Sequence, residues 1–195
     1  MADRLAVQAA TAQEGAEGEG PPPPASLPAP DRAGSQRLPS DRPGKPLPPG
    51  HTLVFAEGTA SVQAGNGGWA WAAPGKRYRS GAAVRTTGRR MELTAVLDAV
   101  RELEGALEVV SSSGYVVNCF RSGWWEGWLS RGWTNSQNKP VANRDLWEPL
   151  IEMYRARPLE FRPAAPADGD WAGKVEWLAA EASRIQQGNE GEISG

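Results

Sequence analysis

Residues 87–103, TGRRMELTAVLDAVREL, decide the fold, because the spacing of the apolar side chains changes there. Before this stretch apolar residues occur in short β-prone runs. From Met91 onwards they recur every three or four positions, as on one face of a helix. The repeating positions are Leu93, Val96, Leu97, Val100 and Leu103. The spacing predicts an amphipathic helix over 89–104, with Thr87 as its N-cap.

Three β-prone runs precede this helix, and turn residues separate them. The runs are 52–55, 69–73 and 76–84, with a Gly-rich stretch at 64–68 and Pro74-Gly75 as the breaks between them. Runs of this length with turns between them predict an antiparallel meander of three strands.

The elements expected after the helix complete an α/β pattern. They are a buried fourth strand over 106–112, helices over 115–129 and 143–155, a fifth strand over 159–164 and a closing helix over 171–185. This order predicts a five-stranded mixed sheet, with three antiparallel strands followed by two parallel ones, and helices on both faces.

The two ends of the chain differ in composition from the part between them. Residues 1–50 are rich in Pro, Gly and Ala and contain few large apolar side chains. Such a segment cannot bury enough surface to offset the entropy lost on ordering, so we expect a disordered leader. It is interpreted as a spacer with polyproline II stretches or, alternatively, as a proline-rich ligand for a protein partner. The folded domain is placed at 51–186 and a disordered tail at 187–195.

Composition excludes several classes of protein. The chain has 195 residues, enough for one domain, and a formal net charge of −2, so nucleic-acid binding requires a local basic patch. The single Cys119 excludes an intramolecular disulfide, and no apolar run is long enough to span a membrane. The first residues lack the pattern of a signal or transit peptide. We expect a monomeric intracellular protein, cytoplasmic by default, with nucleus and organelles left open.

Six segments together resemble type 1 ribonuclease H, and the likeness covers nearly all of 53–185. The segments are 55–59 (FAEGT), 67–69 (GGW), 86–93 (TTGRRMEL), 113–116 (SGYV), 128–133 (WLSRGW) and 138–147 (NKPVANRDLW). The resemblance implies a ribonuclease H-like fold. It also implies an endonuclease that cuts the RNA strand of RNA–DNA hybrids with two Mg²⁺ or Mn²⁺ ions, which activate water and stabilise the leaving 3′ oxygen.

The resemblance assigns four catalytic positions, which in the family carry acids. They are matched here by Glu57, Glu92, Ser112 and Glu176. Of these, the three glutamates are the expected metal ligands. Each also has a structural interpretation: Glu92 is favourable near a helix N-terminus, and Glu176 is compatible with an ordinary solvated helix residue.

Ser112 is the change with the largest expected effect, because a neutral hydroxyl is a weak ligand for Mg²⁺. Asp168 and Asp170, in the loop before the last helix, are candidates to replace the missing carboxylate. The family also tends to place a His in that loop, whereas the only His of this chain is His51. We therefore expect impaired activity.

Basic residues near the predicted helix could bind nucleic acid. Lys76, Arg77, Arg79, Arg85, Arg89 and Arg90 form a run without acids, which predicts phosphate contacts or, alternatively, a solvated strand and helix start. The resemblance places Gln63, Arg85 and Thr87 near a phosphate pocket. It places the backbone of Gly58 and Thr59 at the minor groove of the hybrid, where 2′-hydroxyls identify RNA.

A Trp-rich segment with few basic residues follows the fourth strand. Trp124, Trp125, Trp128 and Trp133 suggest base stacking, but packing in the core is the favoured interpretation because the family's matching aromatics support a basic handle. In this chain the handle has two basic residues, Arg131 and Lys139. We expect them to contact nucleic acid, with weaker affinity than a fully basic handle would give.

Two functions follow from these residues. The first is an RNA–DNA hybrid endonuclease that uses Glu57, Glu92 and Glu176 and is impaired by Ser112. The second is a catalytically inactive ribonuclease H-like domain that binds nucleic acid or a protein partner through the same surface.

Overall fold

The protein is described by a computed structural model over residues 47–62, 65–185 and 189–192. Residues 1–46 of the expected leader and most of the expected tail lie outside these residues. The elements are β1 (Thr52–Ala60), β2 (Gly67–Ala73), β3 (Arg77–Ala83), α2 (Gly88–Glu102), β4 (Leu107–Val110), α3 (Gly114–Arg121), α4 (Trp124–Ser130), α5 (Arg144–Ala156), β5 (Leu159–Arg162), a short 3₁₀ helix η1 (Pro166–Asp168), α6 (Trp171–Ile185) and β6 (Asn189–Glu192). The predicted α/β class is confirmed, and the five predicted strands form the expected mixed sheet, to which β6 adds a sixth strand.

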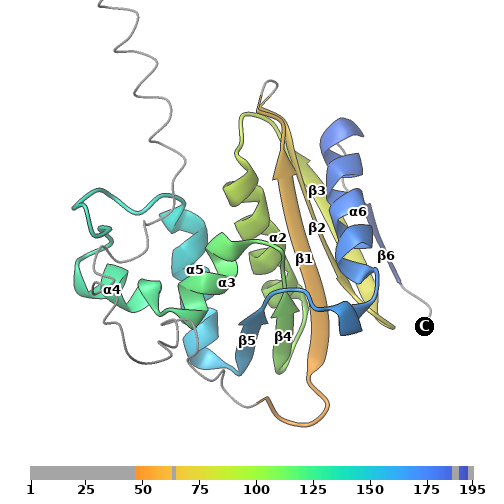
Figure 1. Cartoon of the computed structure of the whole chain (residues 1–195), viewed down its shortest axis with the longest axis horizontal. Coiled ribbons are helices and arrows are strands. Elements are labelled where there is room, and N and C mark those ends of the chain that lie inside the picture. Colours follow the sequence, from red (N-terminus) through yellow and green to blue (C-terminus); the bar gives the residue numbers. More distant parts are fainter. Residues whose placement is uncertain (1–46, 63–64, 186–188, 193–195) are drawn as a thin grey trace, which may run out of the picture.

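The sheet has the strand order β5-β4-β1-β2-β3-β6, so β1 lies inside it (Figure 1). β1 pairs antiparallel with β2, where Phe55 faces Ala72, and parallel with β4, where Phe55 faces Val110. β4 in turn pairs parallel with β5. The first strand therefore brings its residues between the meander and the parallel half of the sheet.

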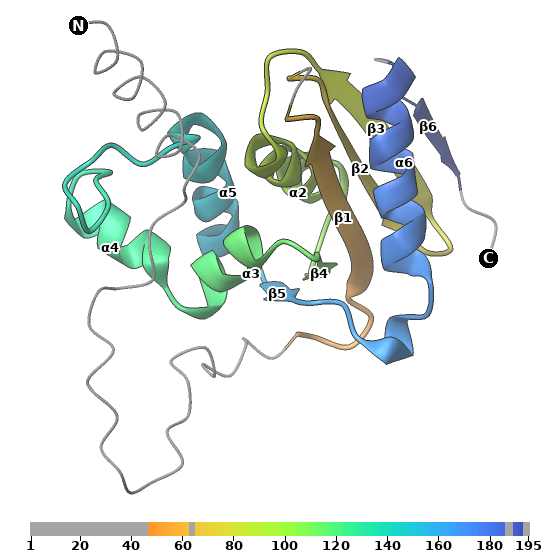
Figure 2. The ribbon, with the colours of Figure 1, turned by 45° about the horizontal axis from the view of Figure 1, so that its top comes forward.

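Helices cover both faces of the sheet, as Figure 2 shows: α6 lies on one face, and α2 with α3 and α5 lies on the other. Alternation along β1 explains the two layers. Val54 and Ala56 belong to the larger core beneath α2, whereas Phe55 belongs to a second core beneath α6. The larger core includes the five residues whose helical spacing predicted α2: Leu93, Val96, Leu97, Val100 and Leu103.

Two glycines allow the layers to approach closely. A Cβ on Gly58 would lie 2.2 Å from the backbone nitrogen of Glu92 on α2. A Cβ on Gly68 would lie 1.9 Å from the backbone oxygen of Ala179 on α6. Both helices therefore pack directly on the strand backbone, and this positions their carboxylates near β1.

Two expectations need correction. The helix expected over 115–129 is broken into α3 and α4, because Gly123 has a left-handed conformation with φ of 69° that ends the first helix. Residues 189–192, expected within a disordered tail, form β6 and pair antiparallel with β3. The open edge of β3 offers backbone hydrogen bonds, and these do not require an apolar pattern in the added strand.

The helices within the described ranges include none that is long and apolar enough to cross a membrane.

Candidate active site

The four positions assigned by resemblance come from four different elements. Glu57 lies on β1 opposite Ala70 of β2. Glu92 is in the second turn of α2, not in its first turn. Ser112 follows the end of β4, and Glu176 lies on α6. The crossing of α2 and α6 over β1 brings these segments together.

Glu57 is a buried carboxylate that Ser112 holds at both oxygens. Its residue is only 4% exposed. The backbone N–H of Ser112 donates to Oε1 at 2.7 Å, and the Ser112 hydroxyl donates to Oε2 at 2.5 Å. Burial raises the pKa of Glu57 to about 7, against the lowering effect of the Ser112 hydrogen bonds and with smaller increases from Glu176 and Glu92. In place of a carboxylate, position 112 thus supplies hydrogen-bond donors.

Glu92 has a parallel arrangement with the next serine. It is half-buried and accepts a short hydrogen bond from the hydroxyl of Ser113. Burial raises its pKa, whereas the Ser113 hydrogen bond and the charge of Arg89 lower it. The same Ser113 hydroxyl caps α3 by accepting from the backbone N–H of Val116. Ser113 therefore ties the carboxylate of α2 to the start of α3.

Glu176 is exposed on α6, and its charge is one of the causes that raise the pKa of Glu57. The three glutamates therefore interact electrostatically across β1, α2 and α6. This mutual repulsion is the kind of field that a bound cation would offset.

The donor chemistry at this place fits a hard divalent cation such as Mg²⁺ or Mn²⁺, because carboxylate oxygens are the ligands that such ions prefer. The number of acids is small. Over the described parts of the chain, no group of three or more His, Cys, Asp or Glu residues is gathered closely enough to hold a metal ion. Ser112 adds hydrogen-bond donors to this cluster and no carboxylate.

The two acids considered as replacements for the missing carboxylate are engaged elsewhere. Both oxygens of Asp168 accept from Arg162 at 2.8 Å. The pair with Arg162 lowers the pKa of Asp168 to about 2. Asp170 forms an ion pair with Lys174 at 3.0 Å. Both acids are thus held in ion pairs with basic residues, and η1 occupies the loop in which the family tends to have a His.

His51 lies just before β1 and contacts Glu108 of β4 at 3.2 Å. The same Glu108 accepts from Nε of Arg162 at 2.6 Å. These contacts join the start of β1 to β4 and β5. At this end of the sheet Thr52 pairs with Leu107, the first residue of β4, whereas Ser112 follows the other end of that strand. The chain's only His therefore connects two strands of the sheet and lies away from the glutamate cluster.

The predicted basic run divides into two parts. Arg77 and Arg79 of β3 pair with Glu102 on α2, at 2.9 and 3.0 Å, and Arg79 also pairs with Asp98. Lys76 donates to the hydroxyl of Thr52. These three cations bind the protein itself, so the run does not form one continuous phosphate-binding surface.

The residues that remain near α2 are arranged around its N-terminus. Arg85 is exposed with a φ of 52°, and Thr87 caps α2 by accepting from the backbone N–H of Arg90. Arg89 lies over the ring of Tyr115, and Arg90 forms a two-pronged ion pair with Asp145, with contacts of 3.0 and 2.6 Å. Gln63 lies outside the described residues, and the backbone of Gly58 and Thr59 follows Glu57 on β1.

The segment between α4 and α5 carries the other two predicted basic residues. Arg131 and Lys139 are both exposed, and a bridge between Thr134 and Pro140 closes the segment. The buried tryptophans Trp128 and Trp133 belong to the main core, and Trp124 and Trp125 pack against it. Packing in the core, the favoured interpretation of these tryptophans, is confirmed.

Comparison with known proteins agrees with this fold. The model of the RNase H family matches residues 49–163. The chain belongs to the ribonuclease H family. It is 36% identical over 137 residues to Ribonuclease H of Syntrophomonas wolfei, covering 67% of this chain and 94% of that relative. It is 38% identical over 111 residues to Ribonuclease H of Thermus thermophilus, covering 54% of this chain and 67% of that relative.

Two solved structures share the ribonuclease H fold. One is the foamy viral protease–reverse transcriptase in complex with dsDNA, with a TM-score of 0.62 and 17% identity over 69% of this chain and 94% of that one. The other is LC9-RNase H1, a type 1 RNase H with the type 2 active-site motif, with a TM-score of 0.57 and 21% identity over 77% of this chain and 80% of that one. Membership of this family relates the chain to hydrolases that act as nucleases.

Some contacts of this ribonuclease H family member were not expected from its sequence. They are the hydrogen bond from Ser113 to Glu92 and the ion pair between Arg90 and Asp145. The run Ser111-Ser112-Ser113 at the end of a buried strand was a signal for the first, because clustered hydroxyls there need acceptors. The matched family segment ends before α6, so the assignment of Glu176 depends on the predicted resemblance and on its charge effect at Glu57.

Proposed function

We propose that the protein hydrolyses the RNA strand of RNA–DNA hybrids with a divalent cation, and that it does so more slowly than a member with four acids. The observation that carries this proposal is the contact between Ser112 and Glu57. Ser112 donates two hydrogen bonds to the carboxylate of Glu57, where the resemblance places another acid. The site thus keeps the orientation of Glu57 and loses a negative charge.

Glu57, Glu92 and Glu176 are the residues that would hold Mg²⁺ or Mn²⁺. When bound, the ion supplies positive charge that offsets the carboxylates and polarises the scissile phosphate. The chain's own residues position the metal-binding carboxylates. Ser112 holds Glu57 through both oxygens, and Ser113 holds Glu92. Mn²⁺ is the more favourable ion here, because it tolerates imperfect ligation.

We propose that the hybrid lies across β1 and the N-terminus of α2. The backbone of Gly58 and Thr59 would approach the minor groove, and the phosphate contacts would come from Gln63, Arg85, Thr87, Arg89, Arg90, Arg131 and Lys139. Arg90 is paired with Asp145, so a phosphate would have to compete with that carboxylate. Affinity is therefore expected to be modest and to fall with salt. We propose that the protein acts as a monomer.

Cleavage of a labelled hybrid in Mg²⁺ and in Mn²⁺ tests the nuclease. We expect slow cutting that requires the metal, is faster in Mn²⁺ and is lost in Glu92→Gln. The matched control is Glu152→Gln, an exposed change on α5 that should leave the rate as it is. An uncut hybrid in both metals, with protein that still binds it, would eliminate the nuclease proposal.

Binding without cleavage is the second candidate, and a specific observation favours it. Glu57 and Glu92 already have serine donors, and no three acids among the described residues are gathered for a metal ion. Such a cluster is stable without an ion. Fluorescence anisotropy with a labelled hybrid in EDTA would show binding that added Mg²⁺ neither strengthens nor converts to cleavage.

A further inference from the structure

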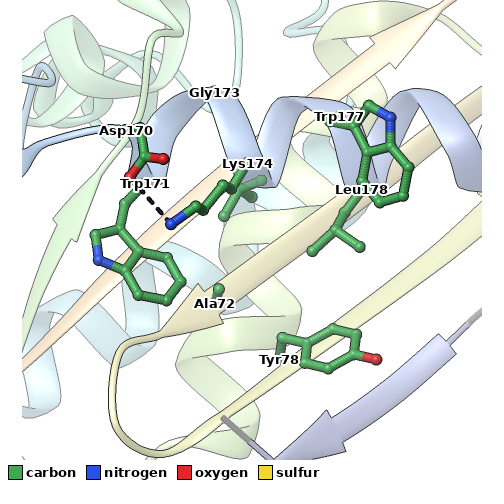
Figure 3. A pocket seen from close by; sticks show the side chains of 9 residues that line it. Ala72, Tyr78, Asp170, Trp171, Gly173, Lys174, Trp177 and Leu178 are labelled. Atoms are coloured by element: carbon green, nitrogen blue, oxygen red, sulfur yellow. Dashed lines mark ion pairs between the residues drawn. The ribbon is translucent and has the colours of Figure 1, made fainter. Parts of the chain in front are cut away.

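A pocket of about 530 Å³ lies between α6 and the strands β2 and β3. Figure 3 shows Trp171 at the start of α6 and Trp177 further along the same helix, with Tyr78 of β3 across from them. Lys174 and Leu178 fill the helix side between the tryptophans, and Lys174 pairs with Asp170 at the rim. The lining is almost wholly apolar.

This pocket is separate from the candidate active site. Glu176 is two residues from both Lys174 and Leu178, which is about 200° around a helix of 3.6 residues per turn. Glu176 acts on Glu57 of β1, whereas Lys174 and Leu178 line the pocket over β2 and β3. A ligand that contacts Lys174 and Leu178 would therefore lie on the opposite side of α6 from the carboxylate.

The aromatic lining is partly open to solvent. Trp177 is 63% exposed, and it is the largest of the exposed apolar side chains in the described parts of the chain. Trp171 is half-buried because its ring stacks on Phe55, with ring centres 6.2 Å apart. Shallow grooves lined by aromatic side chains bind proline-rich segments in the polyproline II conformation, which lose little entropy on binding.

We propose that this pocket binds the chain's own proline run, Pro21–Pro24. Twenty-six residues, 25–50, separate the run from His51. A flexible chain of that length has a root-mean-square span of about 28 Å. The distance to cover is shorter: Phe55, which supports Trp171, is about 10 Å along the strand from Thr52, at roughly 3.3 Å per residue. The leader therefore reaches the pocket without being stretched.

Two further features favour the leader as the occupant. A tethered segment has an effective concentration in the millimolar range, so even a weak site would be filled. The leader also carries acids next to the proline run, Glu14, Glu17 and Glu19, which would compete with Asp170 for the half-exposed Lys174 at the rim of the pocket. An aromatic pocket and a proline-rich segment are thus joined in one molecule.

The test uses the full chain with a nitroxide label at Ala25→Cys. Cys119 is fully buried, so labelling is directed to the new thiol. The readout is the NMR intensity of the tryptophan indole N–H signals with the label oxidised and reduced. We expect the signals of Trp171 and Trp177 to weaken at least about twofold, because the tether keeps the segment and its label near the pocket for much of the time. Trp125 on α4, on the other side of the molecule, is the internal reference and should keep its intensity (Figure 1).

Two variants of the labelled chain complete the experiment. Replacement of Pro21–Pro24 by four serines keeps the length and charge of the leader and should restore both signals. Trp177→Ala removes an exposed side chain with little effect on folding and should restore the signal of Trp171. Unchanged broadening in the serine variant would overturn the proposal, as would equal intensities for Trp125, Trp171 and Trp177 in the unmodified leader. Broadening of the same strength between separately labelled molecules would show that a second copy fills the pocket instead.

Discussion

Replacing the buried Glu57 by Gln should remove a pH dependence from the stability of the metal-free protein. The carboxyl has a pKa of about 7 in the folded protein and an ordinary value of 4.5, and burial is the main cause of the difference. A raised folded-state pKa means that the folded protein binds the proton more tightly. The resulting stability is fully present below about pH 4.5 and is lost as the pH rises through about 7. Gln keeps the shape of the side chain and has no charge to bury.

The size of the effect follows from that pKa difference. One unit of pKa is worth about 1.4 kcal/mol, so a difference of about 2.5 corresponds to about 3 kcal/mol at high pH. Most of it develops between pH 5 and pH 8. Over this interval the free energy of unfolding of the wild type should fall by about 2.5 kcal/mol relative to that of Glu57→Gln.

Urea denaturation in EDTA at pH 5 and at pH 8 measures this difference. The comparison of wild type with Glu57→Gln cancels the titration of all other groups, and Glu152→Gln on the surface of α5 serves as the control. We expect the curves of the wild type and the control to fall together and that of Glu57→Gln to stay higher at pH 8. Parallel curves for the wild type and Glu57→Gln would refute the reasoning that burial dominates at this carboxyl.

Three other changes test the packing and the hydrogen bonds around the site by urea denaturation. Gly68→Ala should lower the free energy of unfolding by about 3 kcal/mol, because its Cβ would lie 1.9 Å from a backbone oxygen of α6. Gly173 lies in α6, and a Cβ there would meet open space, so Gly173→Ala should instead raise the free energy of unfolding by about 1 kcal/mol. Equal effects of Gly68→Ala and Gly173→Ala would contradict the close contact at Gly68. Asp168→Asn should destabilise the protein at pH 7, since the pair with Arg162 lowers the pKa of Asp168 to about 2. As the pH falls from about 4 towards 2, the variant should lose less stability than the wild type, and equal losses would contradict a stabilising pair. Ser113→Ala should cost about 1–2 kcal/mol through the lost cap of α3 and the lost bond to Glu92, and no change would show that this hydroxyl is not structural.

The sequence predicts the main layers of this fold because each layer has a local signal. The helical period beginning at Met91 marks α2, and the alternating β-prone runs mark the meander. The break between α3 and α4 has no such signal, because Gly123 adopts a left-handed conformation inside a continuous apolar pattern. β6 is missed for a related reason: it is added by backbone pairing at the edge of β3.

The sequence predicts which residues form the candidate site, but it does not predict which of them contact one another. Resemblance points to Glu57, Glu92, Ser112 and Glu176, but hydrogen-bond partners depend on how distant segments pack. Ser113 and Glu92 are 21 positions apart, and Ser112 and Glu57 are 55 positions apart. No local pattern specifies which serine meets which carboxylate.

The rate of hybrid cleavage by Ser112→Asp tests the central claim most directly. That claim is that the site lacks one negative charge at the end of β4. Single-turnover cleavage in Mg²⁺ should be faster in Ser112→Asp than in the wild type by about tenfold or more, because a ligand of the metal is restored. Ser112→Ala, which removes the hydroxyl without adding a charge, should give no increase. A wild type that already cuts as fast as Ser112→Asp would contradict the account.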